Sequence, residues 1–121
     1  MGYVKVKARI SNIEKPEKSK EVEFIADTAI YTIVNKKTLE ELEIKPAGKR
    51  KFKLANGEII ERDVGICRID IKDLFTHSMV VFGEERDAEI LGVTTLEELG
   101  LQVDPVTGEL KPMELLLLSY A

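Results

Sequence analysis

The sequence predicts a mainly β domain, built as a closed antiparallel barrel with one or two short helices. Three observations predict this fold class. Short runs of alternating polar and apolar residues recur along the chain. An Asn-Gly dipeptide separates two of these runs, and only two short segments show the patterning of helices. The length of 121 residues fits one domain, spanning residues 1–121.

The first third of the chain contains three predicted strands and a helix. In residues 3–10 the apolar side chains occupy every second position, as they do in a half-buried strand. Residues 21–26 alternate in the same way and predict a second strand, and the β-prone run at 31–34 predicts a third. Asn35 can cap a short helix over residues 36–43, in which two leucines share one face.

A β-hairpin is predicted in the middle of the chain. Two strand-like runs, at 51–55 and 58–63, flank Asn56-Gly57. An Asn-Gly dipeptide between two strands is a strong hairpin signal, because both turn residues can adopt positive φ. Gly65 then separates this hairpin from a further alternating strand at 66–71.

The last third of the chain predicts two strands, a helix and a turn. Residues 79–82 form an apolar strand. The Thr-Leu-Glu-Glu sequence at 95–98 is a capping box that opens a short helix, and Gly100 can end that helix. A proline and a glycine predict a turn within residues 104–108, and residues 110–120 have the composition of a last strand.

The acidic composition argues against nucleic acid and anionic membranes as partners. The formal net charge is −4, whereas a protein that binds phosphate groups needs a positive surface. The basic runs at 36–37 and 49–51 are short, and we interpret both as solvated surface.

The sequence contains no predicted membrane span, and a cytoplasmic location is expected. The longest unbroken apolar run, at 115–118, is too short to cross a bilayer. Residues 1–10 lack the apolar core of a signal peptide. Cys67 is the only cysteine, so no internal disulfide can form, and a reducing compartment is expected.

Asp27 is the residue that most invites a chemical interpretation. It ends an apolar strand, where an unpaired carboxylate is costly to bury unless it is protonated or hydrogen-bonded. By itself it could be an ordinary turn acid, since Asp favours turns. The order of the segments around it favours a catalytic role. The segments are Asp27 with Thr28 and Ala29, the hairpin residues Leu54, Ala55, Asn56 and Gly57, and a later turn of Ile90, Leu91 and Gly92. The family resemblance given next implies that these are the site residues, with Asp27 as the catalytic one.

This order resembles the retroviral-type (retropepsin-like) aspartic proteases, and within them a small, single-domain, chiefly archaeal branch. The family's chain order is two hydrophobic residues and Asp-Thr-Gly, a flap hairpin, two hydrophobic residues and Gly, then a helix. The segments at 54–57, 81–84, 91–100 and 103–110 look typical of that branch, and the resemblance covers nearly the whole chain.

The resemblance implies an acid-protease-like barrel that is active as a homodimer. Two Asp27 carboxylates, one per subunit, would share a proton and activate a water molecule, with no metal and no cofactor. Thr28 would bond the opposite loop, and the hairpin around Asn56-Gly57 would close over an extended peptide substrate. The family's internal duplication would explain why the pattern at 38–44 recurs at 95–101.

The chain departs from the family pattern directly after the catalytic pair. Ala29 and Ile30 stand where the family has Gly and usually Ala. If the backbone at Ala29 needs positive φ, the residue is strained; if φ is negative, its methyl group only tightens the cleft. Two alternative functions therefore stay open. One is a catalytically inactive protease-like dimer that binds peptides or a protein partner, and the other is a purely structural β domain.

The remaining candidates have simpler interpretations. His77 is the only histidine and lacks the companions of a common zinc site, so no metal site is predicted and His77 is interpreted as a surface residue. Asp70, Asp73 and the acidic run at 84–87 are interpreted as solvated turn acids. The apolar run at 113–118 is predicted to lie at a subunit interface.

Overall fold

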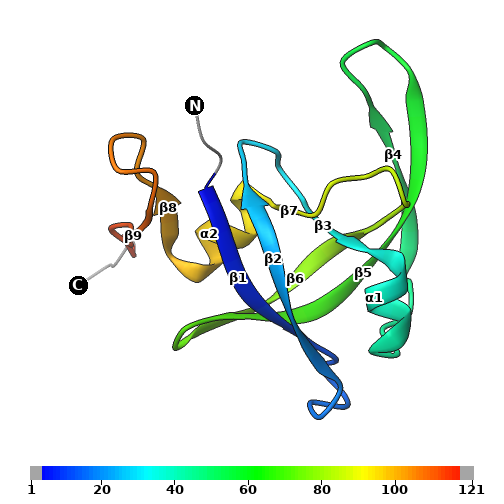
Figure 1. The fold of residues 1–121 in the computed structure, drawn as a ribbon, viewed down its shortest axis with the longest axis horizontal. Coiled ribbons are helices and arrows are strands. Elements are labelled where there is room, and N and C mark those ends of the chain that lie inside the picture. The colour runs from blue at the N-terminus through cyan, green and yellow to red at the C-terminus, as the bar shows by residue number, and fades with distance from the viewer. Residues whose placement is uncertain (1–3, 118–121) are drawn as a thin grey trace.

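The computed structural model describes residues 4–117, and within them the chain forms nine strands and two short helices (Figure 1). The mainly β prediction is confirmed. No helix in this part of the chain is long and apolar enough to cross a membrane. The elements are β1 (Val4–Ser11), β2 (Ser19–Ala26), β3 (Thr32–Asn35), α1 (Lys36–Glu41), β4 (Gly48–Lys53), β5 (Ile59–Ile71), β6 (Leu74–Gly83), β7 (Ile90–Leu91), α2 (Val93–Leu99), β8 (Leu101–Val103) and β9 (Leu110–Pro112).

Seven strands form one mixed sheet in the order β1-β2-β7-β3-β6-β5-β4, and β8 pairs with β9 in a separate two-stranded sheet. β1 also pairs with β5, through residues 9–11. Most neighbours are antiparallel, as predicted. The β2–β7 and β3–β6 pairs are parallel, which the prediction of an antiparallel sheet did not include. Parallel neighbours need a long connection between them, so alternation within one strand cannot reveal them.

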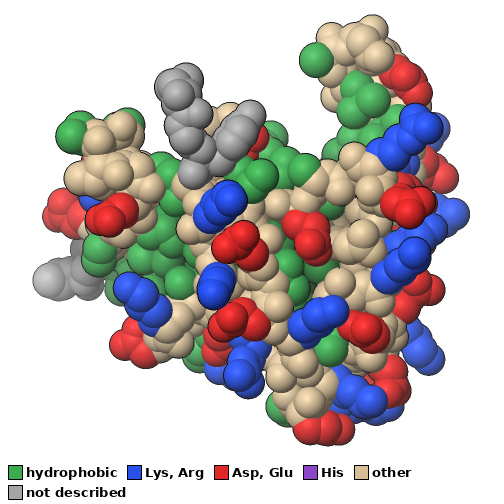
Figure 2. All heavy atoms as spheres, viewed as in Figure 1, with side chains coloured by type: hydrophobic (Ala, Val, Ile, Leu, Met, Phe, Trp, Pro, Cys, Tyr) green, Lys and Arg blue, Asp and Glu red, His purple; other side chains and the backbone are tan. Residues whose placement is uncertain are grey.

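The core lies on one face of the β1–β2 hairpin and under both helices. Every second side chain of these two strands points inward, while their charged side chains cover the outer surface (Figure 2). Burial of these apolar side chains supplies the main free energy of folding. The inward residues are Val6, Ala8, Ile10, Val22, Phe24 and Ala26, and the helices add Leu39, Leu96 and Leu99.

β5 runs unbroken through Gly65, so the predicted break at that glycine is wrong. A Cβ atom at Gly65 would lie 2.9 Å from the Phe82 ring and 3.0 Å from the carbonyl oxygen of Lys45. The glycine therefore permits close packing inside a long strand, and it does not form a turn.

The helix boundaries confirm two predictions and correct a third. Asn35 caps α1, accepting a hydrogen bond from the Lys37 N–H at 2.8 Å. Gly100 ends α2 in the left-handed conformation, with φ of 74°. The capping box predicted at 95–98 does not exist, because α2 begins two residues earlier and the Thr95 side chain is buried.

The central hairpin forms as predicted, but its turn is of another type. Gly57 has φ of 88°, whereas Asn56 does not have positive φ. The Gly57 N–H donates to the Leu54 carbonyl at 2.9 Å, and the Leu54 N–H donates to the Glu58 carbonyl at 2.8 Å. The turn thus starts at Leu54, and only its glycine needs the left-handed region.

The apolar run near the carboxyl end is only partly a strand. β9 accounts for residues 110–112 of the strand predicted at 110–120, residues 113–117 are irregular, and residues 118–120 lie outside the described part. The side chains of Leu115, Leu116 and Leu117 are 70%, 83% and 95% exposed. The described chain therefore leaves a leucine cluster in solvent.

Candidate functional site

Asp27 lies at the start of the loop that follows β2, and its side chain is exposed. The Thr28 N–H donates a hydrogen bond to Asp27 Oδ1 at 2.7 Å, and the Thr28 hydroxyl lies 3.4 Å from the same oxygen. These contacts orient the carboxylate and leave its other oxygen free of hydrogen bonds within residues 4–117. An exposed, oriented carboxylate can accept a proton from a water molecule.

The loop carrying Asp27 crosses the predicted second turn. β2 and β7 pair in parallel, which sets Ala26 beside Leu91. The Asp27 N–H points to the Leu91 carbonyl at 3.4 Å, and the Val93 N–H donates to the Ala29 carbonyl at 2.8 Å. Two of the three predicted site segments, separated by some sixty positions in the sequence, therefore lie side by side.

Gly92 is the residue that lets the two segments approach so closely. A Cβ atom there would lie 2.4 Å from the carbonyl carbon of Tyr31 and 2.6 Å from the carbonyl oxygen of Ile30. Both neighbours are backbone atoms, which cannot move aside as a side chain can. The crossing thus requires glycine for space and not for a special φ value.

Hydrogen bonds between buried hydroxyl groups fix the turn at 90–92 to the underlying elements. The Gly92 N–H donates to the Thr32 hydroxyl at 2.9 Å. The Thr32 and Thr95 hydroxyls are 2.6 Å apart, and the Thr95 and Ser78 hydroxyls are 2.8 Å apart. All three side chains are almost completely buried. A buried chain of mutually satisfied hydroxyls rigidifies the elements that it joins, here β3, α2 and β6.

Ala29 is not strained. Among residues 4–117, only Glu43 and Lys72 have positive φ outside glycine. An alanine therefore fits the backbone where the family has glycine. This excludes the possibility that Ala29 is strained by a positive φ and leaves only the effect of its methyl group on the cleft. Its partly exposed methyl group lines the hollow between the loop and the hairpin.

That hollow has a volume of about 390 Å³ and is mostly apolar. It separates the raised β4–β5 hairpin from the body of the domain (Figure 2). Of the four predicted hairpin residues, Leu54 lines it, whereas Ala55, Asn56 and Gly57 form the exposed tip beyond it. Its lining includes Ala29, Ile30, Tyr31, Ile33, Phe52, Leu54, Ile60 and Val81.

A second hollow, of about 600 Å³, lies on the other side of the loop, toward α2 and β8. Asp27 and Thr28 form part of its wall, and Glu97 adds a second carboxylate. The rest of the wall is mostly apolar, formed by Val4, Ala26, Val93, Leu96, Leu101, Val103 and Met113. The loop with Asp27 therefore stands between two hollows. The ribbon shows the β4–β5 hairpin rising on one side of this loop (Figure 1).

Sequence reasoning missed the residues that connect the hairpin to this loop. The Tyr31 ring packs edge-on against Phe52, with centroids 6.0 Å apart. Arg50 donates to the Tyr31 hydroxyl at 3.1 Å. Arg50, Phe52 and Leu54 occupy alternate positions of one strand, and that period of two was the signal that could have grouped them.

The other titratable candidates stay apart from this site. His77 is exposed and lies beside Phe75. Burial raises the pKa of the Cys67 thiol to about 12, so this cysteine is not a nucleophile at neutral pH. Within residues 4–117 no three His, Cys, Asp or Glu side chains are grouped so that they could hold a metal ion.

Among residues 4–117, the exposed Asp27 carboxylate lies at the crossing of the two turns, and the exposed Glu97 lies in the wall of the neighbouring hollow. One carboxylate can serve as a base, whereas acid–base cleavage of an amide also needs a proton donor at the carbonyl oxygen.

A scan against models of known protein families finds no match for this chain, and a search of curated proteins finds no matching sequence.

Proposed function

We propose that this protein is an aspartic endopeptidase of the retroviral type, active as a homodimer in which each subunit supplies Asp27. The observation that carries the proposal is the crossing of the Asp27 loop with the turn at 90–92. Backbone hydrogen bonds join the two segments, and Gly92 fits against backbone with no room for a side chain. This contact gives a physical role to both halves of the sequence pattern that first suggested the family.

The proposed chemistry needs the two carboxylates to share one proton. Like charges at short distance cannot both ionise, so one Asp27 is protonated and the other is ionised. The ionised carboxylate takes a proton from water as the water oxygen attacks the peptide carbonyl carbon. The protonated carboxylate gives its proton to the carbonyl oxygen. The C–N bond then breaks as the carboxyl group that took the proton from water passes it to the leaving nitrogen. One hydroxyl proton of the gem-diol returns to the other carboxylate, which leaves a carboxylic acid, an amine and the singly protonated pair.

The apolar surface of the described chain supports the dimer. The hollow of about 600 Å³ next to Asp27 has an apolar wall, and the side chains of residues 115–117 are exposed. Exposed apolar surface of this kind marks a site of association, and a second copy of the chain would remove it from water. A two-fold axis near Asp27 would bring both carboxylates together through a self-complementary interface.

Two further expectations belong to the same proposal. A closed barrel is supported by the pairing of β1 with β5, because β5 also neighbours β6 in the same sheet. A cytoplasmic, reducing location suits a chain whose single cysteine is a buried free thiol.

A second candidate function is a dimer of the same shape that binds peptides and does not cut them. Ala29 favours it, because its methyl group occupies space in the hollow below the hairpin that a glycine would leave to the substrate backbone.

Peptide cleavage by the confirmed dimer tests the proposal. Light scattering establishes the dimer, and unstructured proteins are offered between acidic and neutral pH. We expect cleavage at acidic pH, inhibition by a pepstatin-type transition-state mimic, and a loss of at least about a hundredfold in Asp27→Asn. The matched control is Asp73→Asn, which changes an exposed turn carboxylate. A confirmed dimer that neither cuts nor binds the mimic would exclude the endopeptidase.

A further inference from the structure

Two arginines face each other on the inner side of the hairpin, and only one has a carboxylate partner. Arg50 of β4 and Arg62 of β5 are directly opposed in the register. Arg62 makes two hydrogen bonds to the Asp87 carboxylate, at 2.8 Å and 3.3 Å. None of the ion pairs within residues 4–117 includes Arg50. Like charges placed opposite each other repel, so this face carries one uncompensated positive charge.

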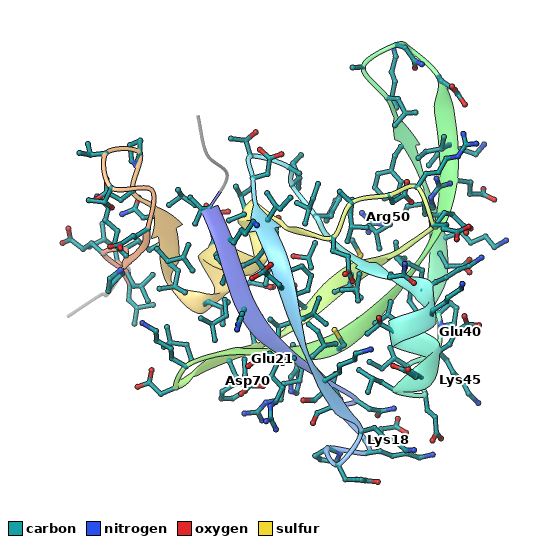
Figure 3. The ribbon with its side chains drawn as sticks, in the orientation of Figure 1. Lys18, Glu21, Glu40, Lys45, Arg50 and Asp70 are labelled. Atoms are coloured by element: carbon teal, nitrogen blue, oxygen red, sulfur yellow. The ribbon has the colours of Figure 1, made fainter. Side chains whose placement is uncertain are left out.

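Arg50 is nevertheless held in a defined position. Its Nη1 donates to the Tyr31 hydroxyl at 3.1 Å, and its guanidinium lies 5.7 Å from the centre of the Tyr31 ring. Tyr31 also packs against Phe52. The residue sits at the base of the raised hairpin (Figure 3). A guanidinium held by a neutral hydroxyl and an aromatic ring keeps most of its donors free for an anion.

The surroundings of Arg50 define what such an anion would belong to. Tyr31 accepts the Arg50 hydrogen bond, and Phe52 lies two residues along β4. Both line the mostly apolar hollow of about 390 Å³, whose charged lining residues are Lys53 and the paired Arg62 and Asp87. A ligand that fills the hollow with an aliphatic or aromatic side chain therefore passes close to a free cation. The planar guanidinium fork matches the two oxygens of a carboxylate.

We propose that Arg50 is a specificity-determining residue that binds a carboxylate of an extended peptide whose neighbouring apolar side chain occupies the hairpin hollow. The inference rests on the proposed role of this hollow in holding peptide. It names the preferred class of ligand, which is a peptide with an apolar residue and a Glu or Asp close to it in sequence.

The strand offers a matched control for this role. Lys51 follows Arg50 directly, so it points to the opposite face of β4. Substitution of either residue by glutamine removes one positive charge from an exposed position of the same strand. A general effect of charge on peptide binding would be equal in the two variants, whereas a direct contact is lost in only one.

The test compares pairs of peptides that are identical except for Glu or Gln at each position around an apolar residue. Binding is measured by fluorescence anisotropy in an Asp27→Asn background, which prevents cleavage, and kcat/KM is measured with Asp27 intact. We expect the Glu peptide to bind about two- to fivefold more tightly at one position. Arg50→Gln should abolish that difference, Lys51→Gln should keep it, and Arg50→Glu should reverse it in favour of the Gln peptide.

The outcomes separate this inference from the proposed function. Peptides that bind with the Glu preference but are never cut would exclude the endopeptidase and support the role of Arg50. Peptides that are cut with equal kcat/KM for Glu and Gln would do the opposite. Equal losses in Arg50→Gln and Lys51→Gln, or no binding of any peptide pair, would overturn the inference.

Discussion

Ala29 is the residue at which the chain departs from the family pattern, and its backbone conformation decides what the departure means. Because φ is not positive there, alanine costs no backbone strain, and only its methyl group differs from the glycine of the family. The methyl group lines the hollow under the hairpin. Under the proposed function, Ala29 therefore reduces the space left for substrate without straining the folded backbone.

We expect Ala29→Gly to preserve or raise cleavage while lowering the free energy of unfolding by about 0.4–1 kcal/mol, because glycine gains freedom in the unfolded chain. Denaturant unfolding and kcat/KM measure the two effects. Ala88→Gly, in an exposed loop before β7, provides a control for the general cost of glycine. A large fall in kcat/KM with unchanged stability would show that the methyl group helps catalysis.

Residue-scale reasoning found the candidate acid and missed its surroundings. Asp27 was recognisable because it ends an apolar strand and because the segments that follow it stand in the order of the retroviral-type proteases. Thr32, Ser78 and Thr95 were not, although their hydroxyls hold the crossing. A threonine or serine in a strand or helix gives no local sign that its hydroxyl has a buried partner far along the chain.

At the scale of elements, the crossing of the Asp27 loop and the turn before α2 depends on Gly92. We expect Gly92→Ala to lower the free energy of unfolding by about 3 kcal/mol, the upper part of the range for overpacking, because the new Cβ would meet backbone at 2.4 Å. Gly48→Ala is the matched control, since no atom lies within 4 Å of its added Cβ. Denaturant titration of both variants measures the difference, and equal stabilities would contradict the described crossing.

The Arg62–Asp87 pair joins β5 to the loop before β7, and it predicts a pH dependence. The Arg62 hydrogen bond, opposed by desolvation and aided by the Glu84 N–H, holds the pKa of Asp87 below its ordinary value of 3.8. A carboxyl group with a lowered pKa in the folded state stabilises above its unfolded pKa, and this contribution is lost as pH falls through the folded value.

We therefore expect Asp87→Asn to cost about 1–2 kcal/mol of unfolding free energy at neutral pH. The two proteins should converge once the pH falls below 3.8 and through the lowered pKa. Unfolding free energies of both proteins across pH provide the measurement, with Asp73→Asn as an exposed control. A difference that persists undiminished into strong acid would contradict the ion pair.

The sequence pattern that recurs at 38–44 and 95–101 also has the same secondary structure in both copies. Each copy contains the end of a short helix, α1 or α2, and each helix follows a strand. Glu43, with φ of 58°, occupies the same place in its copy as Gly100, with φ of 74°. In both copies the N–H of that residue donates to the carbonyl three residues earlier. The two copies thus share the way in which their helices end, with a left-handed residue after the helix. In the first copy that residue is Glu43, so a sequence search for glycine would not find this helix end.

For the whole molecule, the exposed leucines predict the state of association. We expect Leu116→Glu with Leu117→Glu to give monomers by light scattering without loss of β structure by circular dichroism. Each buried leucine side chain contributes about 2 kcal/mol, or about thirtyfold in a dissociation constant. Val106→Glu is the control, because Val106 is 90% exposed on the turn between β8 and β9. A double variant that stays dimeric would place the interface elsewhere.

The sequence by itself determined the mainly β character, the central hairpin, the Asn35 cap and the Gly100 helix end. Each of these depends on residues close together in the chain: alternation within a strand, a turn glycine, or a cap beside its helix. The Asp27 segment, the hairpin residues and the turn at 90–92 became candidates because their order along the chain resembles the retroviral-type proteases.

Only the tertiary structure decided how the candidates meet. The structure adds the parallel β2–β7 pair, the unbroken β5 at Gly65, the contact of Gly92 with the Tyr31 backbone and the hydrogen bond from Arg50 to Tyr31. All of these involve partners distant in sequence. The sequence around a glycine does not show whether the glycine forms a turn or makes room for a neighbouring backbone. Likewise, the sequence around a charged residue does not show whether that residue has a partner of opposite charge. The physical reason is that close packing and charge pairing depend on which surfaces meet, and no local pattern records that choice.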